Sequence, residues 1–89
     1  MTNQEVGEKK LIGEVTHFFG KINVAAIKLT ESLKVGDTIS IEGSTTNFSQ
    51  TVESMQIDNQ TISEAQPGDE IGIKADNKAR DGDKVYLNL

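Results

Sequence analysis

The chain has 89 residues, a formal net charge of −5 and a sequence pI of about 4.7, which fits one small acidic domain. It has no cysteine, which excludes disulfide and thiolate chemistry, and one histidine, which excludes a histidine metal cluster. The acidic balance argues against nonspecific nucleic-acid binding, because such binding depends on neutralising phosphates. The sequence has no long apolar run that would indicate a membrane span, and no apolar segment near its polar start that would indicate a signal peptide. We therefore expect a cytoplasmic protein.

In chain order, we expect a flexible N-terminal tail at residues 1–8 and a single β-barrel domain over residues 9–89. Apolar and polar residues alternate in several short segments, which is typical of half-buried strands. Residues 30–34 should form a connection, with room for one helical turn. Asp58 and Asn59 favour a tight hairpin turn. The expected strands are residues 10–19, 23–29, 38–42, 48–57, 61–62, 70–75 and 84–88.

The expected strand at residues 48–57 contains a break in its pattern. Phe48 and Val52 share one parity, whereas Met55 and Ile57 share the other. All four can face the core only if the strand gains one residue. We therefore predict a β-bulge near residues 53–54, which would also sharpen the bend that a small barrel needs. The alternative is that Met55 and Ile57 cover the opposite face of the sheet.

A Gly-Asp pair precedes three of these strands, in the segments VGDTISI, PGDEIGI and DGDKVYL. Glycine suits a tight turn because it takes positive φ without a steric clash. Aspartate can hold such a turn closed by bonding to nearby backbone. The alternative is a metal or acid–base site made by the aspartates. We favour the turn, because aspartate is a routine turn residue.

Many short strands with regular turn signals predict an all-β protein, either a small antiparallel barrel or a sandwich. We prefer the closed barrel, because so short a chain has little material for two full sheets and because closure removes open sheet edges. No segment shows a sustained helical period.

The sequence contains no recognisable catalytic motif. It has neither a phosphate-binding glycine loop nor the elbow motif of serine hydrolases. A Ser-His-Asp arrangement through His17 is formally possible, but a lone strand histidine beside two phenylalanines is more often structural. We therefore expect no catalytic, cofactor-binding or metal-binding residue, and no enzyme activity.

Two surface regions are candidates for binding. Consecutive aromatic residues cannot both face the core of a regular strand, so one of Phe18 and Phe19 is either exposed or tucked in at a strand end. The candidate partner surface comprises His17, Phe18, Phe19 and Lys21. Basic residues near the C-terminus alternate with aspartates, which indicates either an RNA-binding patch or an ordinary solvated face. The candidate RNA patch comprises Lys74, Lys78, Arg80 and Lys84.

The segments LKVGDTISIEG, VESMQID, ISEAQPGDEIGI and RDGDKVYL resemble the second domain of elongation factor Tu and related translational GTPases. The opening GEVTHFFGKINVAAIKL is similar to the C-terminal barrel of collagenase-like peptidases, a family in which some relatives act in tRNA modification. The resemblance covers roughly residues 11–88. It implies a six- or seven-stranded Greek-key β-barrel of the translation-protein type.

The resemblance carries no enzyme activity over to this chain. The 89 residues leave no room for the GTPase domain of the elongation factor or for the separate catalytic domain of the peptidases. Residues 20–26 also do not reproduce the segment rich in glycine and threonine that precedes the second strand of the elongation factor. The expectation is no GTP binding, no hydrolysis, and only weak, salt-sensitive affinity for tRNA.

Two functions remain. The first is a free-standing, non-catalytic binding module that docks, as a monomer, on a protein or ribonucleoprotein partner in a translation-related process. The second is an accessory subunit of a collagenase-like peptidase or of a tRNA-modifying enzyme, supplying contacts to substrate or RNA. Few aromatic residues and an acidic charge favour a protein partner over RNA.

Overall fold

The computed structural model describes residues 9–89, and the tail predicted at residues 1–8 lies outside this part. The described residues form ten strands and no helix, which confirms the all-β class. The strands are β1 (Lys9–Phe19), β2 (Val24–Leu29), β3 (Leu33–Lys34), β4 (Thr38–Glu42), β5 (Asn47–Thr51), β6 (Met55–Ile57), β7 (Gln60–Ile62), β8 (Glu64–Ala65), β9 (Glu70–Lys74) and β10 (Lys84–Asn88).

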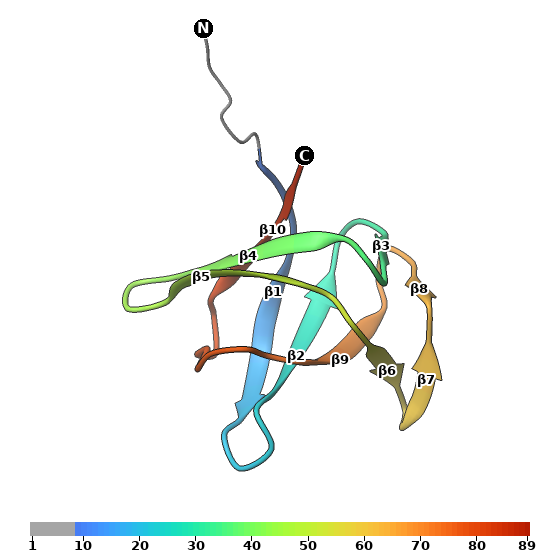
Figure 1. Cartoon of the computed structure of the whole chain (residues 1–89), viewed down its shortest axis with the longest axis horizontal. Coiled ribbons are helices and arrows are strands. Elements are labelled where there is room, and N and C mark those ends of the chain that lie inside the picture. The colour runs from blue at the N-terminus through green and yellow to red at the C-terminus, as the bar shows by residue number, and fades with distance from the viewer. Residues whose placement is uncertain (1–8) are drawn as a thin grey trace, which may run out of the picture.

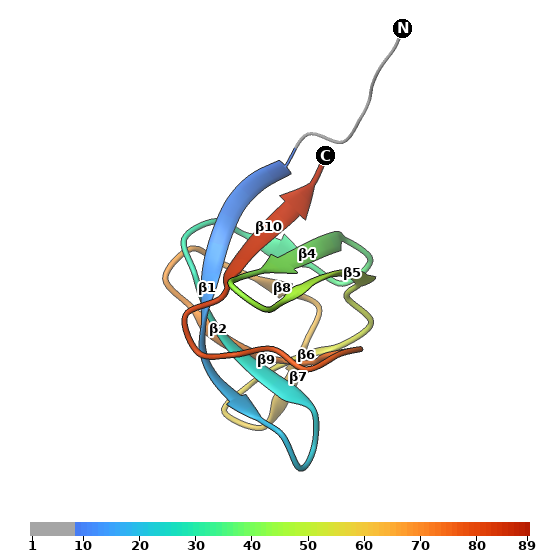
Figure 2. The ribbon, with the colours of Figure 1, turned by 90° about the vertical axis from the view of Figure 1, so that its left-hand side faces the viewer.

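Eight strands form one antiparallel sheet in the order β5-β4-β10-β1-β2-β9-β6-β7, while β3 and β8 form a separate pair. β5 lies at one edge of this order and β6 is next to the other edge, yet only residues 52–54 separate them in sequence. The sheet therefore has to curl until its two ends approach, as Figure 1 shows where β5 runs on toward β6. Figure 2 shows β1 and β10 side by side toward the two chain ends.

The hydrogen-bonded ladder does not close on itself, so the predicted closed Greek-key barrel is not confirmed. A side chain spans the gap instead. The Gln50 amide nitrogen donates to the Lys74 carbonyl at 2.8 Å, and the Asp76 N–H donates to the Gln50 amide oxygen at 2.7 Å. Gln50 is only 7% exposed. One buried amide thus replaces a rung of backbone pairing between β5 and the end of β9, and we call this contact the seam.

The prediction of a β-bulge near residues 53–54, within one continuous strand, is wrong. The chain leaves the sheet for three residues, and its pairing passes from β4 on one side to β9 on the other. Val52 and Met55 are both buried, as predicted, so the alternative in which Met55 covers the opposite face is wrong. The physical reason is that no single partner strand follows the chain through the bend. Bulges occur in β1 instead, between Leu11 and Gly13 and between Val15 and His17.

The three Gly-Asp pairs form three copies of one turn, as predicted. The glycines have φ values of 100°, 93° and 92°, which a side chain would strain. In each copy an aspartate carboxylate oxygen accepts a hydrogen bond from the N–H three residues earlier, at 2.8 to 2.9 Å. These Gly-Asp turns are Lys34 to Asp37, Gln66 to Asp69 and Arg80 to Asp83.

Each Gly-Asp turn also fastens one buried residue of a distant strand or loop. The glycine N–H donates to the carbonyl of that residue, and the aspartate carbonyl accepts from its N–H, at 2.7 to 2.9 Å. The partners are Val52 for the first turn, Leu29 for the second and Val15 for the third. All three are core residues with 1% exposure. The three aspartates therefore stabilise turns of the fold. This explains the repeated Gly-Asp pattern, for which a metal site was the alternative interpretation.

Side chains from both halves of the chain meet in one apolar core inside the curled sheet. β-branched residues dominate it, because inward positions alternate along each strand. Its fully buried members include Ile12, Ile27, Ile39, Ile41, Ile71, Ile73 and Val85.

Candidate binding surface

The hairpin between β1 and β2 carries exposed apolar side chains. Phe19 is 46% exposed and Ile22 is 58% exposed, whereas Phe18 is half-buried and packs against the core. The exposed alternative for the two aromatic residues is therefore the one observed, with Phe19 as the exposed ring. We call residues 17–24 the tip; it is the loop at the bottom of Figure 1.

The third Gly-Asp turn also fastens the base of the tip, through Asp81. The Phe18 N–H donates to one carboxylate oxygen of Asp81 at 3.1 Å. The other oxygen lies 3.7 Å from His17 Nδ1. His17 also stacks edge-on against Phe19, with ring centroids 4.5 Å apart. Both His17 and Asp81 are well exposed, so these contacts orient the tip at the surface and do not form a buried catalytic dyad.

A groove lies on the Phe19 side of the tip, with a volume of about 520 Å³. Its rims are the tip and the β6–β7 turn, and its floor is the outer face of β2 and β9. We call it the Phe19 groove. Its lining residues are Phe19, Ile22, Val24, Ala26, Gln56, Asp58, Asn59, Glu70, Ile71 and Gly72.

The groove is hollow because two of its floor residues are small. Ala26 of β2 lies directly opposite Gly72 of β9, and Gly72 in turn lies opposite Gln56 of β6. Two residues along β2, on the same face, Val24 lies opposite Lys74 on one side and opposite Phe19 on the other. A methyl group and a hydrogen atom thus leave a trough between rows of larger side chains.

A second hollow lies on the Phe18 side of the tip, with a volume of about 490 Å³. We call it the Phe18 hollow. Two cations and one carboxylate line it, whereas two carboxylates and neither lysine nor arginine line the Phe19 groove. Its residues are Phe18, Gly20, Lys78, Ala79, Arg80 and Asp81.

The structure brings together only half of the candidate RNA patch. Lys78 and Arg80 share the Phe18 hollow. Lys74 lies beside Gln50 in a small hollow at the seam. Lys84 of β10 lies in a separate hollow together with Glu14 of β1, whose carboxylate oxygen is 3.2 Å from Lys84 Nζ. Lys21 of the candidate partner surface is exposed in the tip but does not line either hollow beside it.

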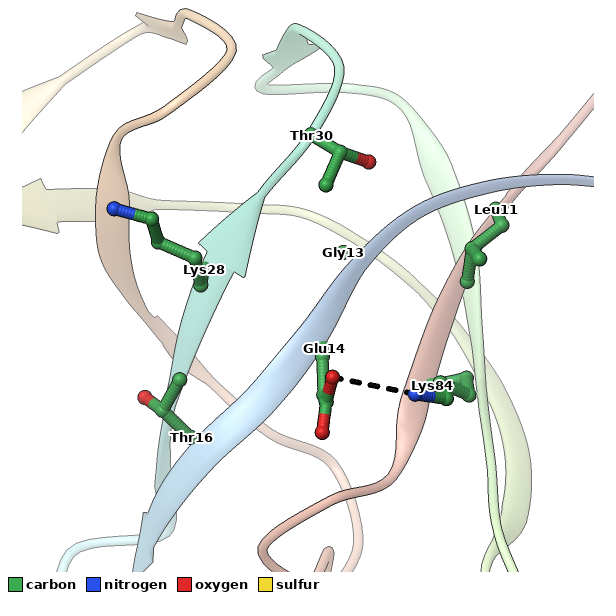
Figure 3. A pocket seen from close by; sticks show the side chains of 7 residues that line it. All are labelled: Leu11, Gly13, Glu14, Thr16, Lys28, Thr30 and Lys84. Atoms are coloured by element: carbon green, nitrogen blue, oxygen red, sulfur yellow. Dashed lines mark hydrogen bonds and ion pairs between the residues drawn. The ribbon is translucent and has the colours of Figure 1, made fainter.

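The Lys84–Glu14 ion pair spans a further hollow of about 300 Å³ on the outer face of β10, β1 and β2, shown in Figure 3. Gly13 forms part of its floor. A Cβ at Gly13 would approach the Lys28 carbonyl oxygen to 2.7 Å, so this position requires glycine for close strand contact. The hollow lies over a bulged strand pair. The charges of Glu14 and Lys84 compensate each other, and Lys28 also lines the hollow, so its lining carries one excess positive charge.

Within residues 9–89, no group of three or more His, Cys, Asp or Glu side chains is arranged to hold a metal ion. The same part of the chain contains no helix long and apolar enough to cross a membrane.

Sequence reasoning found Phe18 and Phe19 but missed most of the Phe19 groove. The sequence predicts Asp58 as a hairpin residue and residues 70–75 as a strand, but it does not predict that Asp58 and Gly72 line one groove. The groove depends on the pairing of β2 with β9 and of β9 with β6, and no local motif specifies that register. The exposed Ile22, next to Lys21 and Asn23 in a turn, was the available signal.

Comparison with known proteins connects this chain to peptidases. An uncharacterized protease of Methanocaldococcus jannaschii is 44% identical over 77 residues, which are 85% of this chain and 19% of that protein. A collagenase of Porphyromonas gingivalis is 33% identical over 81 residues, which are 89% of this chain and 22% of the collagenase. The chain therefore spans about a fifth of the length of these curated relatives. No protein-family model matches it.

Solved structures show the same fold. The C-terminal domain of a Geobacillus thermoleovorans protein assigned to the U32 peptidases superposes with a TM-score of 0.84 and 16% identity, covering 90% of this chain and 93% of that domain. Its selenomethionine variant gives a TM-score of 0.81 and covers 96% of that domain. The resemblance to the C-terminal barrel of collagenase-like peptidases is thus supported, whereas these relatives lend no support to the elongation-factor identity.

Proposed function

We propose that this chain is a non-catalytic accessory domain of a collagenase-like or U32-type peptidase system, and that it binds polypeptide. The observation that carries the proposal is its similarity, over most of its own length, to a fifth of larger proteins named as a protease and a collagenase. A unit that recurs as a minor part of such proteins is suited to supply substrate contacts, while catalysis belongs to the remainder.

The surface supports this function in two ways. Phe19 and Ile22 present exposed apolar area beside a groove, which is the kind of surface that binds other proteins. The Phe19 groove also has a floor of small residues between two rims, which leaves room for a side chain of a bound polypeptide. As a monomer, the domain would present this surface freely.

An NMR titration of the purified chain with gelatin tests the proposal. We expect shifts in the tip and no cleavage of the gelatin after prolonged incubation. Gelatin hydrolysis that disappears when one side chain of this protein is changed would contradict the non-catalytic role. Absence of any interaction with gelatin and with other unfolded polypeptides would contradict the binding role.

RNA contact is a second candidate, favoured by Lys78 and Arg80 beside the half-buried Phe18 ring. A base could stack on the ring while the cations contact phosphates. It would serve the translation-related or tRNA-modifying roles. Because the net charge of −5 opposes a polyanion, we expect such binding to be weak and to vanish at physiological salt. Submicromolar tRNA binding at that salt, centred on residues 21–26, would restore the elongation-factor role.

A further inference from the structure

We propose that the Phe19 groove binds an extended polypeptide segment in which an apolar side chain lies next to lysine or arginine. The proposal rests on the proposed function and names its ligand class. The argument uses the shape of the groove, its apolar surface and its charge in turn.

The shape suits a side chain entering from solvent. Ala26 and Gly72 form the low floor, and the tip and the β6–β7 turn form rims on either side. The turn is rigid for its size, because Asp58 and Asn59 both have positive φ in a two-residue hairpin. A floor of small residues between fixed rims admits one protruding side chain of a bound segment.

The apolar surface of the groove favours entry of an apolar side chain. Phe19 and Ile22 are among the few large apolar side chains left exposed in the described residues, and both line the groove with Val24. Burial of apolar area against them is favourable because it removes that area from water. The amide side chains of Gln56 and Asn59 stand at the rim, where they can pair with the backbone of an extended segment.

The charge selects what flanks the apolar side chain. Asp58 and Glu70 line the groove and no lysine or arginine does. Glu70 accepts a hydrogen bond from the Thr16 hydroxyl at 2.6 Å and lies opposite Lys28, which lines a different hollow. Asp58 forms no ion pair within residues 9–89. A cationic side chain is therefore attracted, most strongly near Asp58, and a phosphate is repelled.

Gly72 allows a test that fills the groove and keeps the fold. A Cβ at this position would meet only Val24 Cγ1 at 3.4 Å, an ordinary contact, and the residue has no positive φ. Gly72→Leu should therefore fold normally, with its side chain lying in the trough. Asp58→Asn removes one charge while keeping a residue that favours the turn. Lys78→Ser, in the Phe18 hollow, is the matched control for a surface change beside the tip.

The experiment is selection from a random twelve-residue peptide display library on the immobilised chain, followed by affinity measurement with the selected synthetic peptides. We expect sequences with leucine, isoleucine, methionine or phenylalanine adjacent to lysine or arginine. Gly72→Leu should weaken their binding at least tenfold. Asp58→Asn should weaken it about threefold at low salt and less at high salt, because salt screens exposed charges. Lys78→Ser should leave it unchanged.

Several results would overturn the proposal. These are a library that yields no binders, acidic or purely polar selected peptides, and peptides that Gly72→Leu retains with undiminished affinity. Self-association or tRNA binding that Gly72→Leu abolishes would assign the groove to a second copy or to RNA. Polypeptide binding that survives Gly72→Leu would refute the groove but leave the proposed function standing, whereas absence of any polypeptide binding by the unchanged protein would refute both.

Discussion

Gly82 and Gly20 both lie in loops that contact β1, yet they have different roles in the structure. Gly82 has a φ of 92° and its turn fastens the buried Val15 by two backbone hydrogen bonds. Gly20 lies in the tip, has no positive φ, and has open space around it apart from the Phe18 ring at 4.0 Å. The contrast separates residues that hold the sheet together from residues that remain available for binding.

Gly82→Val should have the largest effect on stability. A β-branched residue at this positive φ costs on the order of 1–3 kcal/mol, and movement of the turn would also weaken its bonds to Val15. Gly20→Val is the matched control and should change the free energy of unfolding by less than about 0.5 kcal/mol. Urea denaturation of both variants gives the comparison. Equal losses would show that the tip is as constrained as the turn.

Gln50→Ala should have the next largest effect, because it removes the seam. The Lys74 carbonyl and the Asp76 N–H would each lose their bond to a largely buried partner, at a cost of about 2 kcal/mol. Thr51→Ala, at the exposed neighbouring position, serves as control and should be nearly neutral. Amide hydrogen exchange should also rise at Asp76 in the Gln50 variant. Unchanged exchange there would mean that the seam contributes nothing to closing the sheet.

Asp83→Ala should cost about 1 kcal/mol or slightly more, through loss of its bond from the Arg80 N–H. Asp83 is 5% exposed, and a Cβ at Gly43 would lie only 2.0 Å from its carboxylate, so it is closely packed. Asp37→Ala removes the same type of bond in the first turn, where the aspartate is more exposed, and should cost less. Thermal unfolding ranks the two. A larger loss of stability for Asp37→Ala than for Asp83→Ala would contradict the expectation that the more buried aspartate contributes more.

Phe19→Ser should have the smallest effect on stability, within about 0.5 kcal/mol, because nearly half of the side chain is already exposed. Phe18→Ser should cost more, since that ring packs against the core. For binding of the selected peptides the order should be reversed, with the Phe19 variant losing more affinity. A Phe19 variant that unfolds readily but binds peptide normally would make the exposed ring a structural residue.

The sequence predicted the parts of the fold that local chemistry specifies. β4 and β10 have the bounds expected from the alternation that follows Gly36-Asp37 and Gly82-Asp83. The Asp58-Asn59 turn is also as expected. β3 and β8 were missed, because a two-residue strand is too short to show any period.

The remaining features depend on contacts between distant segments. In the sequence, Gln50 is indistinguishable from any other polar strand residue. It forms the seam only because the sheet curls and brings β5 close to the end of β9. The six or seven strands implied by resemblance become ten, partly because the long fourth strand divides where its pairing partner changes. The four residues of the candidate RNA patch are close in sequence, whereas Lys84 and Lys78 line different hollows in the structure.

The partners of the Gly-Asp turns also bear on the order of folding. The first turn fastens Val52, which is close to it in sequence, whereas the third fastens Val15 near the opposite end of the described chain. Loop-closure entropy makes distant contacts slower to form than near ones. The chain should therefore assemble from its middle outward, with docking of the third turn on β1 as a late step. That late contact also fastens Asp81 to the tip, so the binding surface should become ordered only when the two ends of the domain have met.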